Sequence, residues 1–242
     1  MAAPPQITRF NRCREMQIEI PIDRSAKLEI TTVVSEMFSQ NAYILRRTDQ
    51  TNCVVVDPSF EANSILEYLA EHSCDVSAIL NTHGHIDHII GNQTIKDRFP
   101  TAPLIIGELD AYKLTDSQAN LSAGYGIELN SPEADKTVKH GEYLSFAGIT
   151  LETRLTPGHS AGHVVWVYEA AEVGVVVNGD VLFAGSVGRT DFPDGSFEAL
   201  EQSIQEQLYT LPSDTVVLTG HGNMTTIGQE KDINPFVRPL NT

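Results

Sequence analysis

The sequence is poor in cysteine, in basic residues and in long apolar runs, and each shortage excludes a class of protein. Its 242 residues include 3 cysteines, and 16 Lys and Arg stand against 32 Asp and Glu, a formal net charge of −16 at pH 7. So few basic residues argue against a nucleic-acid surface, which needs basic patches to neutralise phosphates. No apolar run approaches the roughly 20 residues that span a bilayer. We therefore expect neither a nucleic acid nor a membrane as a partner.

The cysteines and the first residues bear on the compartment. Cys13, Cys53 and Cys74 are odd in number and show no C-x-x-C spacing, which favours structural thiols in a reducing compartment. The opening run Met-Ala-Ala-Pro-Pro lacks the apolar core of a secretory signal. Residues 1–14 contain three arginines and no acid, which faintly resembles a transit peptide. We favour a short extension, or a start codon assigned too early relative to Met16, and expect a cytoplasmic protein.

Histidine is also scarce, yet three of the 8 histidines fall within six residues. The run Asn81–Gly91 contains His83, His85, Asp87 and His88. Neutral imidazoles and a carboxylate are ligands of borderline divalent metals such as zinc. His83 and His85 share one side of an extended segment because its period is two, whereas Asp87 and His88 begin the next helix and point elsewhere. The spacing therefore predicts a two-metal site, with a polar turn of solvated histidines as the alternative.

Further ligand-type residues follow the predicted ends of three other strands. His159, Asp180 and His221 each come directly after a glycine at the end of an apolar or β-rich segment. A glycine lets the chain turn sharply and approach an ion closely. Together with the run at 81–91, four strand-end loops would deliver His and Asp to one edge of a sheet. This pattern predicts an active-site edge.

Strands and helices alternate along the chain without a linker. We expect strands at 28–34, 41–46, 53–57, 76–80, 143–146, 149–155, 163–168, 173–177 and 215–218, helices at 63–72, 87–98, 196–208 and 226–232, and a strand followed by a helix at 103–114. Residues 115–141 are polar and read as a surface excursion that could reach over the site. The pattern suggests an α/β (α+β) fold, an αββα sandwich of two mixed sheets flanked by helices. We expect an N-terminal extension at 1–27 and one catalytic domain at 28–242.

These motifs resemble the metallo-β-lactamase-fold hydrolases, and most of all their single-domain glyoxalase II-like (hydroxyacylglutathione hydrolase-like) branch. The resemblance is carried by T-H-G-H-I-D-H, T-P-G-H-S-A-G-H, G-D-V-L-F, G-R-T-D-F and the late segment T-G-H-G-N-M-T-T-I-G-Q-E-K-D-I-N-P-F. The resemblance covers about residues 28–240. It supports the topology of the αββα sandwich more strongly than the alternation of strands and helices does. Two-domain glyoxalase II enzymes resemble this chain only in the core. The helical C-terminal domain that contributes to their glutathione site is expected to be missing here, which puts the substrate in doubt.

The resemblance implies a role for each ligand-type residue. One metal ion is assigned to His83, His85 and His159, and a second to Asp87, His88 and His221, with Asp180 bridging the two. The implied ions are divalent, with zinc first and iron or manganese as alternatives. Asp57 ends a strand and could itself be a ligand, but its family position favours a carboxylate that orients a ligand loop. His163 is left out of the set because its β-rich surroundings favour either a supporting place behind the ligands or a partner in the backbone.

Three residues are candidates for contact with the substrate. Arg189, in the G-R-T-D-F run, could pair with a glutathione carboxylate, or equally with Asp191 to lock its own loop. Phe38 and Asn41 match a family segment near the mouth of the metal site, although Phe38 could equally belong to the core.

The metal pair determines the predicted chemistry. Two ions about 3.5–4 Å apart share a water and lower its pKa to near 7, which gives a bridging hydroxide at neutral pH. That hydroxide attacks a carbonyl, and Asp87 and Asp180 are the carboxylates expected to orient it. A thioester suits the site because a thiolate leaves with little protonation. We therefore predict a binuclear metallohydrolase that cleaves a small thioester, such as S-lactoylglutathione or a related hydroxyacyl-glutathione.

Two other classes of function are compatible with the motifs. A mononuclear iron persulfide dioxygenase acting on glutathione persulfide belongs to a family that resembles this chain in T-P-G-H and G-R-T-D-F. A metal-binding scaffold without turnover is the third class, and a complete ligand set with open positions for water argues against it.

Overall fold

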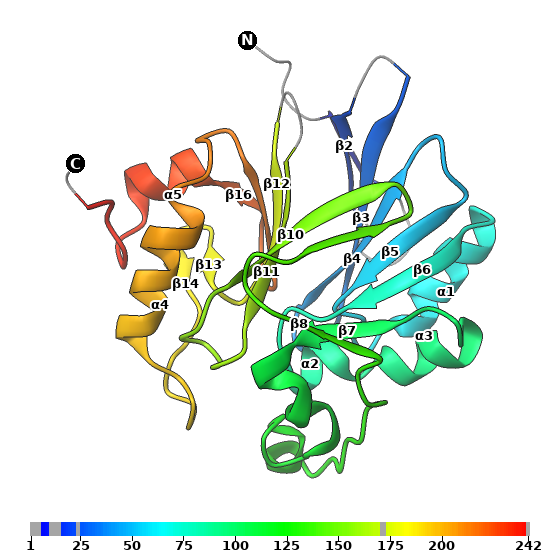
Figure 1. Cartoon of the computed structure of the whole chain (residues 1–242), viewed down its shortest axis with the longest axis horizontal. Coiled ribbons are helices and arrows are strands. Elements are labelled where there is room, and N and C mark those ends of the chain that lie inside the picture. Colours follow the sequence, from blue (N-terminus) through cyan, green and yellow to red (C-terminus); the bar gives the residue numbers. More distant parts are fainter. Residues whose placement is uncertain (1–5, 10–15, 23–24, 170–172, 241–242) are drawn as a thin grey trace.

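The computed structural model describes residues 6–9, 16–22, 25–169 and 173–240, with side chains from residue 16 onward. Its strands lie mainly in two sheets that pack face to face (Figure 1). The first sheet contains eight strands in chain order: β1 (Gln6–Arg9), β2 (Met16–Pro21), β3 (Lys27–Val34), β4 (Asn41–Arg47), β5 (Asn52–Val56), β6 (Asp75–Leu80), β7 (Leu104–Gly107) and β8 (Lys136–Val138). Neighbours are antiparallel from β1 to β5 and parallel from β5 to β8, so the sheet is mixed.

The second sheet is also mixed, with six strands in the order β16-β15-β12-β11-β10-β9. These strands are β9 (Tyr143–Phe146), β10 (Ile149–Leu155), β11 (Val164–Tyr168), β12 (Val175–Gly179), β15 (Val216–Thr219) and β16 (Thr225–Thr226). The β12–β15 pair is parallel and the other pairs are antiparallel. A short hairpin of β13 (Leu182–Phe183) and β14 (Ser186–Val187) follows Asp180.

Helices cover the outer face of each sheet (Figure 1). The first sheet is covered by α1 (Ala62–Glu71) and α3 (Asn92–Arg98), and the second by α4 (Phe197–Ser203), the π-helical turn η3 (Ile204–Leu208) and α5 (Ile227–Ile233). The remaining helical elements are the short α2 (Ile86–Ile89) and the 3-10 helices η1 (Glu108–Thr115) and η2 (Ser122–Tyr125). In the ranges that the structure describes, no helix is long and apolar enough to cross a membrane. The expected αββα sandwich is confirmed.

Strand residues alternate between an inner and an outer apolar layer. On β5, Val54 and Val56 lie in the core between the sheets, whereas Cys53 and Val55 pack toward the helices of the first sheet. Because both faces are covered, such a strand reads as a continuous apolar run rather than as an alternating one. Full burial of a valine side chain contributes about 1.5–3 kcal/mol, so these layers hold the strand ends in place for the site.

The helix expected over 87–98 is interrupted. The structure has α2 and α3 instead, with Ile90 and Gly91 between them. The Gly91 N–H donates to the Pro58 carbonyl, 2.9 Å away, and so leaves the helical ladder. A Cβ at Gly91 would lie 2.5 Å from the Ser59 carbonyl oxygen, which explains why a residue without a side chain stands at this close approach.

Two expected boundaries also differ from the structure. Residues 1–27 were expected to be an extension, but β2 pairs with β3 and buries Ile18 and Ile20, so the sheet begins before residue 28. The excursion at 115–141 contributes a strand, because β8 pairs with β7. Cys13 lies outside the described residues.

Candidate metal centre

Loops from both sheets meet at the predicted edge. The Val164 N–H donates to the Thr82 carbonyl across the sandwich (2.8 Å), and the Asn41 N–H donates to the Gly220 carbonyl (2.7 Å). These bonds join the carboxyl end of β6 to β11, and the start of β4 to the loop after β15. Residues far apart in the sequence are thereby held side by side at one end of the strands.

All seven predicted ligands lie at this edge. Their ligand atoms fall within 4.8 Å of one another in three overlapping groups: His83, His85 and His159; His83, His88 and Asp180; and Asp87, His88 and His221. Asp180 lies between the first and third groups, because its Oδ2 is 3.5 Å from His159 Nε2 and 3.4 Å from His221 Nε2. The structure therefore brings the predicted ligands together in one cluster.

Most of the ligand histidines are anchored through Nδ1. An oxygen atom holds this nitrogen at 2.8–3.1 Å in four of them: Thr82 Oγ1 for His83, Asp57 Oδ2 for His88, the Arg189 carbonyl for His159 and the Phe38 carbonyl for His221. Since the carbonyl and carboxylate oxygens accept the Nδ1 proton, the lone pair on Nε2 is left for an ion. Second contacts of this kind fix both the tautomer and the ring orientation of a metal ligand.

Several ligand atoms have no hydrogen bond in the protein, although His88 Nε2 and Asp180 Oδ1 lie 3.5 Å apart as an ion pair. The Nε2 atoms of His83, His85 and His88 and Oδ1 of Asp180 are buried without a hydrogen bond. Each unsatisfied buried polar atom costs about 1–3 kcal/mol. His85 Nδ1 also lies 2.9 Å from His159 Nε2, so these two imidazoles are close enough to share a hydrogen bond in the metal-free protein. A cation removes the penalty of the unsatisfied atoms, so this set of imidazoles and carboxylates fits divalent ions of the zinc class.

Burial keeps most of the ligand imidazoles neutral. It lowers the pKa of His83, His85 and His159, and positive neighbouring imidazoles lower that of His83 and His85 further. Neutral imidazole is the form that binds a metal, so these rings are ready without losing a proton.

The other ligands form a charged group in the metal-free protein. Burial opposes protonation of His88 and His221, but the carboxylates of Asp87 and Asp180 outweigh it and raise the pKa of His88 to about 9 and that of His221 to about 11. Burial would raise the pKa of each carboxyl, yet His88 and His221 hold both below their usual range. In the metal-free protein the protons on His88 and His221 thus supply the positive charge that bound ions are expected to supply.

Asp57 supports the ligand loop from below. Its carboxylate accepts hydrogen bonds from the Thr82 N–H and Thr82 Oγ1, both at 2.7 Å, and from His88 Nδ1 at 2.9 Å. Its backbone has a φ of +50°, an uncommon value for a residue other than glycine. The structure places Asp57 as an orienting carboxylate, outside the three ligand groups.

A second buried carboxylate, which the sequence analysis missed, joins the two histidine loops. Asp110 accepts hydrogen bonds from the Gly84 N–H (2.9 Å), from Ser160 Oγ (2.8 Å) and from the Gly162 N–H (2.8 Å). Gly84 separates His83 from His85, and Ser160 follows His159. Asp110 therefore sets the spacing between two loops that supply the same group of ligands.

Lys113 completes this network. Its side chain is 1% exposed, and Nζ lies 3.4 Å from Asp110 Oδ1 and 2.7 Å from Asp194 Oδ2. Asp194 also accepts a hydrogen bond from the Ala161 N–H (3.0 Å). The only signal in the sequence is an Asp and a Lys at i, i+3, which usually indicates a solvated surface pair.

His163 is buried beside the ligands but is not among them. Its Nε2 accepts a hydrogen bond from the Asp180 N–H (3.1 Å), and its Nδ1 lies 3.1 Å from Thr156 Oγ1. Both ring nitrogens therefore have partners in the protein, as expected when His163 was left out of the metal set. It orients the backbone of Asp180 instead.

The predicted substrate contacts occupy three different places. Asn41 is buried, and its Nδ2 donates to the carbonyls of Thr219 (3.0 Å) and Gly222 (2.9 Å), so it fastens the loop of His221. Phe38 is only partly buried and lies beside that loop rather than in the core.

Arg189 adopts the second of its two expected arrangements. Its Nε and one terminal nitrogen both contact the Asp191 carboxylate at 2.6 Å, and both side chains are more than 60% exposed. The guanidinium also lies over the ring of Phe192, 4.5 Å from its centroid. A role toward a substrate carboxylate stays a prediction.

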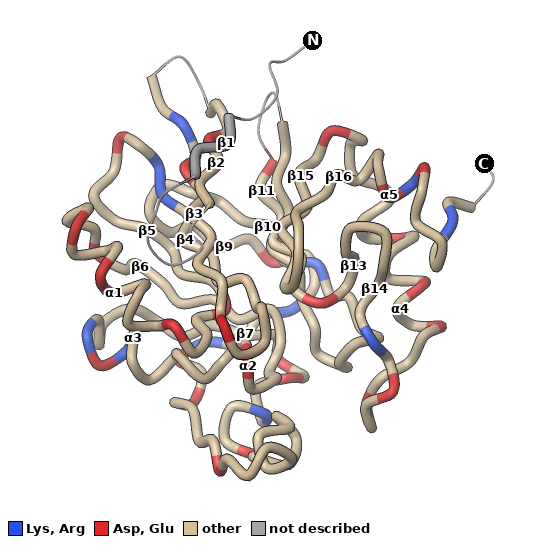
Figure 2. Tube along the Cα trace, turned by 180° about the vertical axis from the view of Figure 1, so that it is seen from behind, with Lys and Arg blue, Asp and Glu red and all other residues tan. Residues whose placement is uncertain are grey.

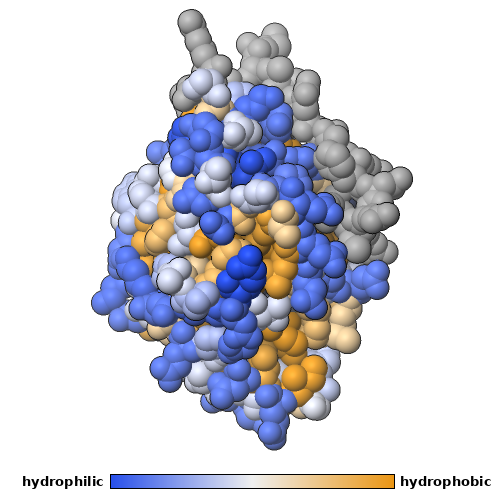
Figure 3. Space-filling model, turned by 90° about the vertical axis from the view of Figure 1, so that its right-hand side faces the viewer, coloured by the Kyte–Doolittle hydropathy of each residue, from blue (hydrophilic) through white to orange (hydrophobic). Residues whose placement is uncertain are grey.

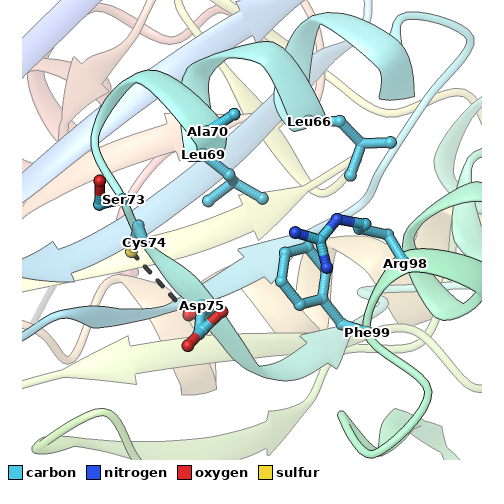
Figure 4. A pocket seen from close by; sticks show the side chains of 8 residues that line it. All are labelled: Leu66, Leu69, Ala70, Ser73, Cys74, Asp75, Arg98 and Phe99. Atoms are coloured by element: carbon cyan, nitrogen blue, oxygen red, sulfur yellow. Dashed lines mark hydrogen bonds between the residues drawn. The ribbon is translucent and has the colours of Figure 1, made fainter.

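A separate pocket of about 380 Å³ lies between α1 and α3 (Figure 4). It is lined by Leu66, Leu69, Ala70, Ser73, Cys74, Asp75, Arg98 and Phe99. Figure 3 views the molecule from this side and shows apolar residues around its centre. Because Asp75 begins β6 and the metal loop follows its other end, the pocket and the ligands are roughly 16 Å or more apart along the strand. It does not belong to the metal centre.

Comparisons with known proteins agree with this geometry. Residues 36–221 match the family model described as the metallo-beta-lactamase superfamily. A probable metallo-hydrolase of Bacillus subtilis, YqgX, is 39% identical over 81% of this chain and 92% of its own length. The hydroxyacylglutathione hydrolase GloC of Haemophilus influenzae is 34% identical over 87% and 97%. The crystal structure of BLEG-1, described as a B3 metallo-beta-lactamase, superposes with a TM-score of 0.81 and 34% identity, and covers 86% of this chain and 99% of that one.

The residues that match the family model include every predicted ligand. The similarity to YqgX and GloC covers nearly the full length of both relatives. The chain belongs to the metallo-beta-lactamase superfamily, in its glyoxalase II-like branch of metal-dependent hydrolases.

Proposed function

We propose that this metal-dependent hydrolase is binuclear and cleaves thioesters, with S-lactoylglutathione or a related hydroxyacyl-glutathione as the first substrate to test. The observation that carries the proposal is the position of Asp180, whose carboxylate faces ligand atoms on both sides of the cluster. The similarity to GloC supports the thioester, because that relative is a hydroxyacylglutathione hydrolase.

The protein's residues have separable tasks in this proposal. His83, His85 and His159 would hold one ion and Asp87, His88 and His221 the other, with Asp180 shared. Ions bound there would supply a Lewis acid for the thioester carbonyl and lower the pKa of a water to about 7. Asp87 and Asp180 stay ionised because their histidine neighbours hold both pKa values low, so carboxylate oxygens are available to orient the attacking water. The leaving thiol, with a pKa of about 8.5, departs as thiolate with little need for a general acid.

A direct assay tests the proposal. Protein purified without chelator should contain close to two ions per chain by elemental analysis, with zinc expected first and iron or manganese as alternatives. It should release free thiol from S-lactoylglutathione without consuming oxygen. Asp180→Ala should abolish this release, whereas Tyr143→Ala, a change on the edge strand β9, should leave it intact.

Three outcomes would overturn the proposal. Oxygen uptake with glutathione persulfide, together with no thioester cleavage, would assign the chain to the persulfide dioxygenases. Hydrolysis of a β-lactam but not of a thioester would favour the activity that BLEG-1 is described by. A stable content of one ion per chain, unchanged by added zinc or manganese, would remove the second metal position.

A further inference from the structure

Aromatic side chains form a wall on one side of the metal centre. Phe38 stacks on Phe60 with ring centroids 5.4 Å apart, and it meets Tyr125 edge-on at 5.2 Å. Tyr125 is 60% exposed, so this wall faces solvent. The Phe38 carbonyl holds Nδ1 of His221 at 3.1 Å, which places the wall directly beside a ligand.

A second set of rings lies against other candidate ligands and also against His221. Phe192 packs edge-on against His85 (4.8 Å) and His159 (5.4 Å), and Phe183 lies 6.1 Å from His221. Aromatic surface therefore adjoins ligands of both proposed ions.

The cations next to these rings are already paired. Arg189 lies over Phe192, but Asp191 contacts its guanidinium at two positions, 2.6 Å each. Lys113 is buried between Asp110 and Asp194. Acidic residues recur in many parts of the trace that Figure 2 colours by charge, in keeping with a net charge of −16. The glutathione part of a thioester carries two carboxylates and one ammonium group, so beside these rings it meets apolar surface and cations that already have carboxylate partners, on a protein of net negative charge.

From this arrangement we infer that the site prefers thioesters whose thiol part is uncharged and apolar over thioesters of glutathione. The inference rests on the proposed thioesterase function and refines its substrate class. The aromatic rings bind the uncharged thiol part through apolar contact, whereas the two carboxylates of glutathione gain no free cation from Arg189 or Lys113. Asp191 is therefore a specificity-determining residue, because it neutralises the arginine at the mouth.

A matched pair of substrates tests the preference. The lactoyl thioesters of glutathione and of N-acetylcysteamine share the acyl group and the bond that breaks, so their ratio of kcat/KM reports on the thiol part alone. We expect the N-acetylcysteamine ester to be favoured by about tenfold, and added salt to narrow the difference by screening the repulsion of glutathione. A higher kcat/KM for the glutathione ester would overturn the inference. Cleavage of neither ester would instead refute the proposed thioesterase function.

Two variants locate the preference in the structure. Asp191→Asn frees Arg189 and should lower KM for the glutathione ester severalfold while leaving the neutral ester unchanged. Tyr125→Ala should raise KM for the neutral ester severalfold, with metal content and Tm unchanged. Tyr143→Ala is the control, because Tyr143 is equally exposed (65% against 60%) on β9, outside both sets of rings. Equal changes for both esters in either variant would mean a purely structural role and would contradict the inference.

Discussion

The region beneath the metal ligands and the mouth above them are built in different ways. Beneath the ligands, Asp57 and Asp110 are fully buried, and each accepts three hydrogen bonds from the loops that carry histidines. At the mouth, Tyr125, Arg189 and Asp191 are at least 60% exposed. The lower region holds the ligands in place before an ion arrives. At the mouth, few contacts restrict which side chains the exposed positions can carry.

The energetic scales of the two regions differ accordingly. Removal of one partner from a buried ion pair costs about 3–5 kcal/mol, because an uncompensated charge is left behind. An exposed pair such as Arg189–Asp191 contributes little, because water and salt screen it. Changes beneath the ligands should therefore affect metal content and folding, and changes at the mouth should affect the choice of substrate.

The largest effect is expected from the carboxylate that both ligand groups share. Asp180→Ala should reduce the metal content by at least one ion per chain and abolish hydrolysis, because its Oδ2 faces ligands of both groups. His163→Gln is the matched control, since His163 is buried next to Asp180 but outside the ligand set. It should lower stability and keep both ions. Elemental analysis that shows equal metal loss in the two variants would contradict the bridging position.

The next effect concerns the network that joins the two histidine loops. Asp110→Ala should lower the free energy of unfolding by about 3–5 kcal/mol, because two backbone N–H groups and Ser160 Oγ lose their buried acceptor and Lys113 keeps only Asp194 as a counter-charge. Zinc affinity, measured by competition with a chelator, should fall in the same variant. Asp135→Ala serves as the control, since Asp135 pairs with Lys96 in a more exposed position. Retention of full zinc affinity would separate Asp110 from the metal centre.

A smaller effect should appear when ion binding is followed against pH. In the metal-free protein His88 has a pKa of about 9 and His221 of about 11, so each must lose a proton before it binds an ion. The affinity for the ion at these residues should therefore rise with pH, by about tenfold per unit for each proton released, between pH 7 and 8. Calorimetric titrations in two buffers of different ionisation enthalpy count the protons, and identical heats in both would refute the linkage.

The same groups predict how the metal-free protein responds to pH. Their folded-state pKa values lie above the ordinary value of 6.5, so their contribution to stability is complete below pH 6.5 and is lost as the pH rises through about 9 for His88. The pKa of His83 and of His85 is lowered, so those two destabilise the fold as the pH falls below 6.5. Chemical denaturation of the chelated protein between pH 6 and 9 measures the free energy of unfolding on both sides of pH 6.5.

The smallest effect is expected at the mouth. Arg189→Ala should leave Tm and metal content nearly unchanged, because its pair with Asp191 is exposed. The KM for S-lactoylglutathione should change by less than about threefold, since the guanidinium is already occupied. A tenfold rise in KM, about 1.4 kcal/mol, would instead establish Arg189 as a partner of a substrate carboxylate. The mouth would then contribute to function as strongly as the region beneath the ligands.

The candidate ligands could be picked out from the sequence because their signals are local. His83, His85, Asp87 and His88 lie in one short run, and each of the later ligands follows a glycine at a strand end. The sandwich followed from the strand and helix pattern together with the resemblance. Even β2 has a readable pattern, since buried Ile18 and Ile20 alternate with less buried neighbours, and only the position of the boundary was missed.

Other features depended on contacts across the fold. Asp110 is separated from Ser160 and Gly162 by 50 and 52 residues, and its hydrogen bonds exist only because the two sheets bring these loops together. The break before α3 depends on the Pro58 carbonyl, which belongs to another loop.

By itself the sequence predicted a set of candidate metal ligands and the strands that carry them, because ligand type, strand period and glycine position are properties of neighbouring residues. Only the tertiary structure showed that Asp110 supports the candidate ligand loops, because its partners lie far away in the sequence. The sequence left two partners open for Arg189, and the structure shows that Asp191 holds it. The physical reason is that the role of a charged side chain depends on its burial and on the partner that the fold brings to it, and neither is written in its immediate neighbours.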